Sequence, residues 1–558
     1  MMAIMCSIRA RMLARIVAGV SITIAASAAL AQNLFFQPGN LVVSRSVYDN
    51  NAATISPGII LPPGCANTLG GCSNPATSDG TYPAVWNNNL ADGSFGITSK
   101  ILLDQITTAG MLVNTLEVPN SSDSGITSTS DQMVTSFSSK SEIALNLSLS
   151  GKYLTFMGYL APIDAIDVSN SNTVYIAPWF GISTVDFTNP VGEYVYRVVA
   201  EVDENGNLQF TKTNSYSGNN GRAAILNDVN GANVVYMAGN AGNGGNPQPN
   251  GVIISTGAQI LTPSALPESA QIPGAPTPVG SFNITQVDDK ADKIGKDTNF
   301  RGLTIHNNVI YYTKGSGGNG INTVYFIDTT GSACPNGVGL PSPGAALPTT
   351  PIPYSIASVP TLGVAPYNMC ILAGFNTSLA KNDTSHFPFG LFFANDSTLY
   401  VADEGNGTNT YSTDTATYTA AAGQTTAGLQ KWTFNAEAGE WQLAYVLSAG
   451  LNLGVPYVVP SYPTGSNPVT MLPWAPATDG LRNITGLVQG GNVTIWAITS
   501  TVSGNGDQGA DPNQLVVIND SLAATTPGAE TFTTLRSAGY GEVLRGVSFT
   551  PSSTIASE

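Results

Sequence analysis

Four arginines recur at matching places in a repeated pattern of this sequence, and they are the residues best suited to chemistry. Each stands near the start of an apolar, strand-like run, at Arg222, Arg301, Arg482 and Arg545, and a fifth copy carries Phe389 there. A guanidinium group presents a planar fork of donors that matches carboxylate, sulfate or phosphate. Gathered around one axis, these side chains predict a positive site for an anionic or polar ligand.

A structural role for the same arginines is the alternative. Arginine at the start of a strand can tie neighbouring repeats together through hydrogen bonds to backbone carbonyls. It can also pair with carboxylates, and Asp403 and Glu404 follow a strand-like run of their own. The sequence leaves both roles open.

Histidine offers the main catalytic candidate, although the chain contains only two histidines. His386 stands just before a strand-like run and can serve as a general base. His306 falls in the turn that follows such a run. No Gly-x-Ser-x-Gly motif supplies a nucleophile. We therefore expect a non-enzymatic binding protein, with the alternative of a sugar- or lactone-directed hydrolase or lyase that uses His386 as base and an arginine to steady a substrate carboxylate.

Metal and cysteine patterns predict little cofactor chemistry. Asp507 and Asp511 form a weak candidate for calcium, but no loop follows an EF-hand pattern, and no cofactor is expected. After Cys6, the remaining cysteines are even in number and fit no zinc spacing. Each of two pairs brackets one loop-like segment, which predicts the disulfides Cys65–Cys72 and Cys334–Cys370.

The elements that must position these residues are pairs of apolar runs joined by short polar turns. Clear copies begin at Arg222, Arg301, Phe389 and Arg482, with a weaker copy at Ser141. Each interval has room for two further strands, and four strands make one propeller blade. With 59 glycines and 35 prolines, the composition also favours an all-β chain. We predict a six-bladed β-propeller with four-stranded blades, and residues 48–139 leave room for a seventh blade.

A half-copy of the repeat ends the pattern. Residues 545–551 match the start of the copy at Arg301, but no partner strand follows them. The run 40–46 near the N-terminus supplies the missing strand. Because a circular array is closed when one blade takes strands from both ends of the chain, these two segments are expected to pair.

One unit resembles the NHL-repeat and SMP-30/gluconolactonase-like propellers. The resemblance rests on FPFGLFF at 387–393 followed by LYVADEGN at 399–406, and other units match loosely. It implies a propeller fold. In the lactonase-like branch, acidic and amide side chains near the central axis hold a divalent metal. Here the matching strand starts carry arginine or phenylalanine, and this departure disfavours a metal-dependent lactonase.

The N-terminus predicts export. Arg9, Arg11 and Arg15 precede an apolar run that ends in Ala29-Leu30-Ala31, which is typical of a signal peptide over residues 1–31. A single domain over 32–558 would follow, secreted or periplasmic, with no later run long enough to span a membrane. The formal charge of −16 disfavours nucleic acid and anionic membranes as partners. The expected partner is a polar or anionic ligand or an extracellular protein.

Overall fold

The computed structural model describes residues 34–49, 97–171, 195–240, 257–264, 299–352 and 368–553, except 138, 167, 214, 217–218, 317–319, 335, 469 and 506–508, together with the backbone of 285–286 and 289–290. Phe35–Glu558 form one compact unit, and the account below concerns that unit. The predicted signal peptide, the Cys65–Cys72 disulfide and Asp507 lie outside the described residues.

Six sheets of three or more strands form the described propeller, and we number them as blades 1 to 6. Blade 1 has the order β29-β1-β2-β3, with β4 also paired to β2, and blade 2 has the order β5-β6-β7-β8. Their strands are β1 (Leu41–Val47), β2 (Thr98–Ile106), β3 (Leu112–Glu117), β4 (Thr135–Ser136), β29 (Glu542–Phe549), β5 (Asn146–Leu147), β6 (Tyr153–Tyr159), β7 (Arg197–Asp203) and β8 (Leu208–Thr213).

Blades 3 and 4 have the orders β9-β10-β11 and β14-β15-β16-β18-β17. Their strands are β9 (Gly221–Asn227), β10 (Val234–Gly239), β11 (Ala258–Leu261), β14 (Leu303–His306), β15 (Val309–Lys314), β16 (Thr323–Ile327), β17 (Val338–Gly339) and β18 (Met369–Leu372). The described part of blade 3 thus has three strands, and blade 4 has five.

Blades 5 and 6 each have four strands, in the orders β19-β20-β23-β24 and β25-β26-β27-β28. Their strands are β19 (Pro388–Asn395), β20 (Thr398–Asp403), β23 (Gly428–Asn435), β24 (Glu440–Leu447), β25 (Ala477–Gln489), β26 (Asn492–Val502), β27 (Gln514–Ser521) and β28 (Thr533–Ser537). The remaining elements are β12 (Thr285–Gln286), β13 (Asp289–Lys290), β21 (Tyr411–Ser412), β22 (Thr417–Tyr418), the 3₁₀ turn η2 (Val168–Asn170) and α1 (Thr419–Ala422).

The blades follow one another in a closed circle. Neighbouring blades contact each other through their first strands, in the series β29, β5, β9, β14, β19 and β25, and β25 then contacts β29. The chain is therefore a six-bladed β-propeller, as predicted. The stretch that left room for a seventh blade instead contributes β2 and β3, which complete blade 1.

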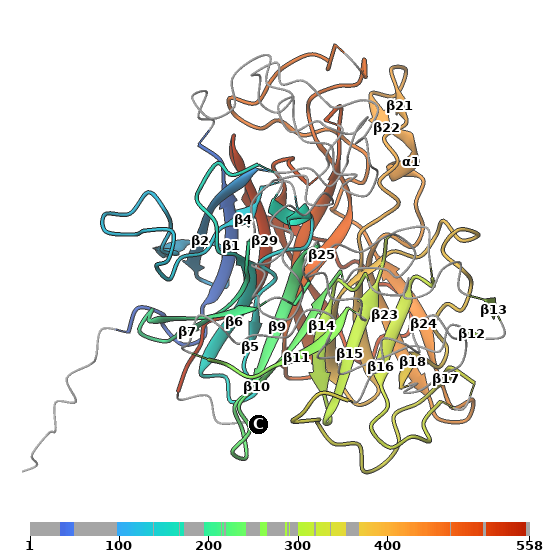
Figure 1. The fold of residues 1–558 in the computed structure, drawn as a ribbon. Helices are drawn as coiled ribbons and strands as arrows, with labels where there is room; N and C mark the ends of the chain where they lie inside the picture. The colour runs from blue at the N-terminus through green and yellow to red at the C-terminus, as the bar shows by residue number, and fades with distance from the viewer. Residues whose placement is uncertain are drawn as a thin grey trace, which may run out of the picture. The chain divides into compact units, whose positions relative to one another are not determined.

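Blade 1 is shared by the two ends of the pattern, which confirms the predicted closure. β1 pairs antiparallel with β29, with Leu41 opposite Phe549 and Val47 opposite Glu542. Figure 1 shows β1, in blue, beside β29, in red. Pairing both strands removes the open edge that an incomplete sheet would expose.

The hairpins predicted from paired apolar runs are present in the inner half of four blades. Ile225 lies opposite Tyr236, Leu391 opposite Val401, and Ile484 opposite Ala497. All seven residues of β9 are buried, as expected for a strand covered by blades on both faces.

The weak copy at Ser141 was expected to start a strand, but that expectation is wrong for residues 141–145. The first strand of blade 2 is the short β5, which begins only at Asn146. Ile143 has a φ of 51°, so the chain leaves the extended conformation there. This turn brings the carbonyl of Ile143 to the hydroxyl of Ser44 in blade 1, 2.7 Å away.

Glycines that follow two of the repeated arginines let adjacent blades approach closely. A Cβ atom on Gly302 would lie 1.9 Å from the carbonyl oxygen of Phe389 in the next blade. One on Gly546 would lie 2.5 Å from the backbone nitrogen of Leu145. The Arg-Gly pairs therefore encode the packing of inner strands as well as the position of the arginines.

The disulfide Cys334–Cys370 is present and confirms that prediction. It joins the loop after β16 to β18, across a Cα–Cα distance of 5.8 Å. Disulfides of this kind are typical of chains in oxidising compartments. In the part of the chain that the structure describes, no helix has the length and apolarity needed to cross a membrane.

Candidate functional site

The repeated arginines come from the inner strands of different blades. Arg222 lies in β9, Arg301 just before β14, Arg482 in β25 and Arg545 in β29, and all four are buried. The charges of Arg222, Arg301 and Arg482 act on one another in the series Arg222–Arg301–Arg482. We call these three residues the arginine cluster.

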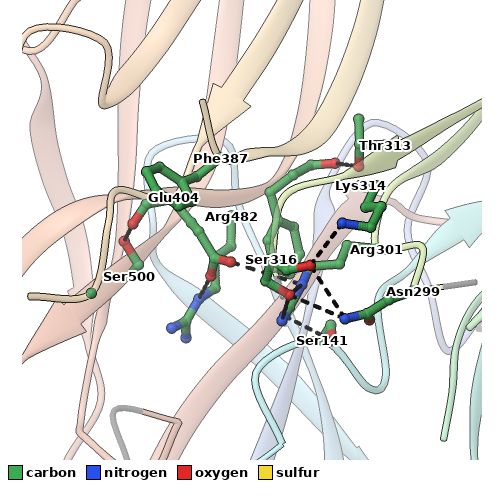
Figure 2. A network of polar contacts seen from close by, with 12 residues as sticks. Ser141, Asn299, Arg301, Thr313, Lys314, Ser316, Phe387, Glu404, Arg482 and Ser500 are labelled. Carbon is green, nitrogen blue, oxygen red and sulfur yellow. Dashed lines mark hydrogen bonds and ion pairs between the residues drawn. The ribbon is translucent and has the colours of Figure 1, made fainter. Parts of the chain in front are cut away.

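Glu404 is the carboxylate at the middle of this cluster. Its Oε2 lies 3.2 Å from Nε of Arg482, and its Oε1 lies 3.8 Å from Nε of Arg301, as Figure 2 shows. Burial raises the pKa of the Glu404 carboxyl, but the charges of Arg301, Arg482 and Lys140 outweigh that effect and lower the pKa. Glu404 is therefore ionised and ties blade 5 to blades 4 and 6.

Two hydroxyl groups and one aromatic ring contact the Arg301 side chain. Its Nε donates to the hydroxyl of Ser316 at 2.9 Å, and Nη1 donates to the hydroxyl of Ser141 at 3.3 Å. The ring of Phe389 lies 5.4 Å from its Cζ atom. Since Phe389 is fully buried, its ring supports Arg301 in this structure. Its predicted contact with a ligand stays a prediction.

Arg222 is less completely bonded. Its Nη1 donates to the carbonyl of Phe300 at 2.9 Å and to the side-chain oxygen of Asn299. Among the described residues, its buried Nε has no hydrogen-bond partner. Burial and the charge of Arg301 lower the pKa of Arg222 to about 9. The guanidinium thus remains charged at neutral pH, and the charges of Glu142 and Glu404 offset the effect of burial only in part.

Arg482 uses only one of its nitrogens within the described residues. Nε pairs with Glu404, while its two terminal nitrogens have no hydrogen bond there. Figure 2 shows these nitrogens directed away from Glu404. A guanidinium donates through five N–H groups, so the described part of the chain leaves the terminal donors of Arg482 unused.

Two further carboxyls lie near the cluster and carry raised pKa values. Burial, together with the charge of Glu404, raises the pKa of both Asp403 and Asp479 to about 7. Asp403 accepts the backbone N–H of Phe387 at 2.8 Å, and Asp479 accepts that of Gly407 at 2.8 Å. Sequence reasoning identified Asp403 but missed Asp479, whose position three residues before Arg482 was the available signal.

Arg545 makes a different kind of contact. Its Nη2 donates to the carbonyl of Gly509 at 2.9 Å and to that of Phe137. These bonds tie β29 to two neighbouring loops. These are contacts of the kind that the structural alternative predicts, and ligand binding by Arg545 stays a prediction.

His386 is paired with an aspartate at the entry to blade 5. Its Nδ1 lies 2.6 Å from Oδ2 of Asp383, and its side chain is 37% exposed. The next residue, Phe387, donates its backbone N–H to Asp403. The His386–Asp383 pair is therefore close in sequence to a residue that contacts a carboxyl near the cluster. His306 is at the far end of β14 from Arg301, where its Nε2 lies 3.0 Å from Asp396.

Of the two residues of the weak calcium candidate, only Asp511 lies among the described residues. Asp511 is buried, and its Oδ1 accepts the hydroxyls of Tyr462 and Ser503, each at 3.0 Å. In the described residues, the only group of three metal-ligating side chains is Asp328, Cys334 and Cys370, whose two sulfurs form the disulfide. Calcium at Asp507 and Asp511 stays a prediction.

Comparison with known proteins gives only distant likeness. No family model matches the chain, and no curated protein matches it. Among solved structures, an ulvan lyase of polysaccharide lyase family PL25 is 14% identical, with a TM-score of 0.27, over 81% of this chain and 88% of the lyase. The structure of such a lyase with bound -[GlcA(1-4)Rha3S]- gives 13% and 0.28 over the same shares. Similarity this low supports no inference about activity.

Proposed function

We propose that this chain is an exported, non-enzymatic propeller that binds the anionic group of a ligand at the arginine cluster. The observation that carries the proposal is the arrangement of charge: Glu404 pairs with Arg301 and Arg482, while the third arginine of the cluster forms no ion pair among the described residues. That arginine, Arg222, is acted on by the charges of Glu142 and Glu404 without pairing with either. The terminal nitrogens of Arg482, which have no hydrogen bond among the described residues, are the part of the cluster that a ligand would occupy.

The physical argument is one of compensation. Burial lowers the pKa values of Arg222 and Arg301, and the neighbouring positive charges lower them further. A bound anion relieves both effects, because it supplies the opposite charge in a region of low dielectric. The three guanidiniums of the cluster, one of which has no ion pair among the described residues, therefore favour an incoming anion.

The size of the anion follows from exposure. Arg482 is only 3% exposed. The group that reaches it must therefore be small, such as one carboxylate or sulfate projecting from a larger polar molecule. An acidic oligosaccharide or an acidic side chain of an extracellular protein has this form.

Calorimetric titration of the purified protein with trigalacturonate and with a sulfated disaccharide tests the proposal, and maltotriose serves as the neutral probe. Arg482→Lys keeps a positive charge for Glu404 but loses the planar fork, so we expect at least about tenfold weaker binding of the acidic probe. The matched control is Arg536→Lys on β28, where the arginine pairs with Asp104 at 2.9 Å. Equal affinity in wild type and Arg482→Lys, or no binding of either acidic probe, would rule the proposal out.

A second function is favoured by the pairing of His386 with Asp383. A hydrogen bond from Nδ1 to the carboxylate leaves Nε2 with the lone pair that a general base needs. With an arginine on the substrate carboxylate, such a base suits a lyase or hydrolase acting on acidic sugars or lactones. Turnover of these substrates that is lost in His386→Gln would replace the binding proposal with this one.

A further inference from the structure

A pocket lies between blades 2 and 3, on strands away from the arginine cluster. It encloses about 480 Å³ and is lined by β7 and β8, by the turn between β9 and β10, and by the segment after β11. Cavities of this size hold small molecules in other proteins. The lining side chains that matter here are Asp131, Tyr153, Glu201, Phe210 and Asp228.

Glu201 is the unusual member of this set. It lies in the middle of β7 and is only 7% exposed, and the structure gives its carboxyl no hydrogen bond within the described residues. Burial and the nearby charge of Asp228 raise the pKa of Glu201 to about 7. Burial disfavours the ionised form of this carboxyl, and an opposite charge in the pocket would favour it.

The neighbours of Glu201 increase this demand. Asp228 is fixed in place, since it accepts the backbone N–H of Ser150 at 2.9 Å and the hydroxyl of Ser148 at 3.1 Å. Asp131 is balanced by Lys212, whose Nζ lies 3.2 Å from its carboxylate. Within the described part of the chain, neither Glu201 nor Asp228 has an ion-pair partner, so their carboxyls are available to a cation.

We propose that this pocket binds a small organic cation, with its ammonium or guanidinium group against Glu201 and Asp228 and its carbon chain against Tyr153 and Phe210. Aromatic rings beside a cation add favourable contact to the charge pairing. A metal ion fits less well, since calcium takes six to eight oxygen ligands. The carboxylates of Asp131, Glu201 and Asp228 do not all lie within 4.8 Å of one another, which is the spacing expected of a preformed metal site.

Titration calorimetry with spermidine and with agmatine tests this site, with calcium chloride and maltotriose as alternative probes. Glu201→Gln keeps the shape of the side chain and removes its charge, so we expect at least about tenfold weaker binding of the amine. The matched control is Glu437→Gln, an exposed glutamate in the turn between β23 and β24, which should leave the affinity unchanged.

The pH dependence makes the test sharper. The charged or titratable groups around Glu201 are Asp131, Asp228, Lys212 and Tyr153, from four segments of chain. Because the cation requires the ionised form of Glu201, affinity should rise roughly tenfold from pH 6 to pH 8 in wild type and stay flat in Glu201→Gln. Amine binding that is independent of pH and of Glu201, binding of calcium or maltotriose instead, or no binding at all would overturn the proposal.

Discussion

The arginine cluster and the outer pocket are opposite solutions to buried charge. In the cluster, positive groups from three blades meet around Glu404, and most of them have polar partners. In the pocket, burial and the charge of Asp228 raise the pKa of Glu201, whose carboxyl has no hydrogen bond among the described residues. Both groups join neighbouring blades, since Glu404 pairs with arginines of blades 4 and 6 and Asp228 of blade 3 accepts hydrogen bonds from the segment after β5 in blade 2. Glu201 itself makes no such contact among the described residues.

Removing the central carboxylate should produce the largest effect. Glu404→Gln leaves Arg301 and Arg482 without their shared counter-charge, so we expect the free energy of unfolding to fall by about 3–5 kcal/mol. Urea denaturation followed by tryptophan fluorescence measures the change.

The same substitution in the pocket is the matched comparison. The pKa of Glu201 is raised in the folded state, so folding favours the protonated carboxyl. The free energy of unfolding therefore falls as pH rises from the unfolded pKa toward 7. Glu201→Gln should therefore be at least as stable as wild type at pH 8 and equal to it at pH 4. A loss of stability in Glu201→Gln similar to that in Glu404→Gln would contradict the distinction between the two regions.

Tight packing of the inner strands predicts a second, smaller effect. Gly302→Ala places a methyl group against the carbonyl of Phe389, which must move away, at a cost of about 1–3 kcal/mol. Gly539→Ala is the control, because its methyl group would meet only the side chain of Glu542, at 3.4 Å. Thermal unfolding of both variants measures the difference, and equal midpoints would mean that the blades adjust without strain.

The ligand affinities of the cluster and of the pocket should change with pH in opposite directions. This is the smallest but most specific expected effect. Asp403 and Asp479 have pKa values of about 7, so both lose negative charge as pH falls from 8 to 6. Trigalacturonate should therefore bind the cluster several-fold more tightly at pH 6, while spermidine binds the pocket less tightly. Asp479→Asn should reduce the first response and leave the second unchanged. Parallel changes for both probes would show that one common site, or the whole fold, is titrating.

Repetition explains how much of this molecule the sequence predicted. The circular closure was readable because Arg545 begins a half-copy whose partner strand was missing. Arg222, Arg301 and Arg482 were grouped correctly, because inner strands place equivalent residues around one axis. The contacts of Arg545 could not be predicted from the repeat, because the carbonyls of Phe137 and Gly509 come from loops that follow no repeat.

The outer pocket shows where this kind of reasoning ends. Asp131, Glu201 and Asp228 occupy a loop, the middle of a strand and a turn, and no spacing relates them. In the sequence, nothing distinguishes Glu201 from the other residues of β7. Only the packing of blade 2 against blade 3 turns it into a buried carboxylate beside a second one.

The pairing of β1 with β29 has a consequence for the order of assembly. Residues 41–47 leave the ribosome about five hundred residues before residues 542–549, which must cover their free edge. During that interval β1 has only β2 as a neighbour, and its other side is open to pairing with a second chain. Newly made chains are thus open to pairing through β1 until β29 has been made, and a chain cut short at Tyr540 would remain in that state.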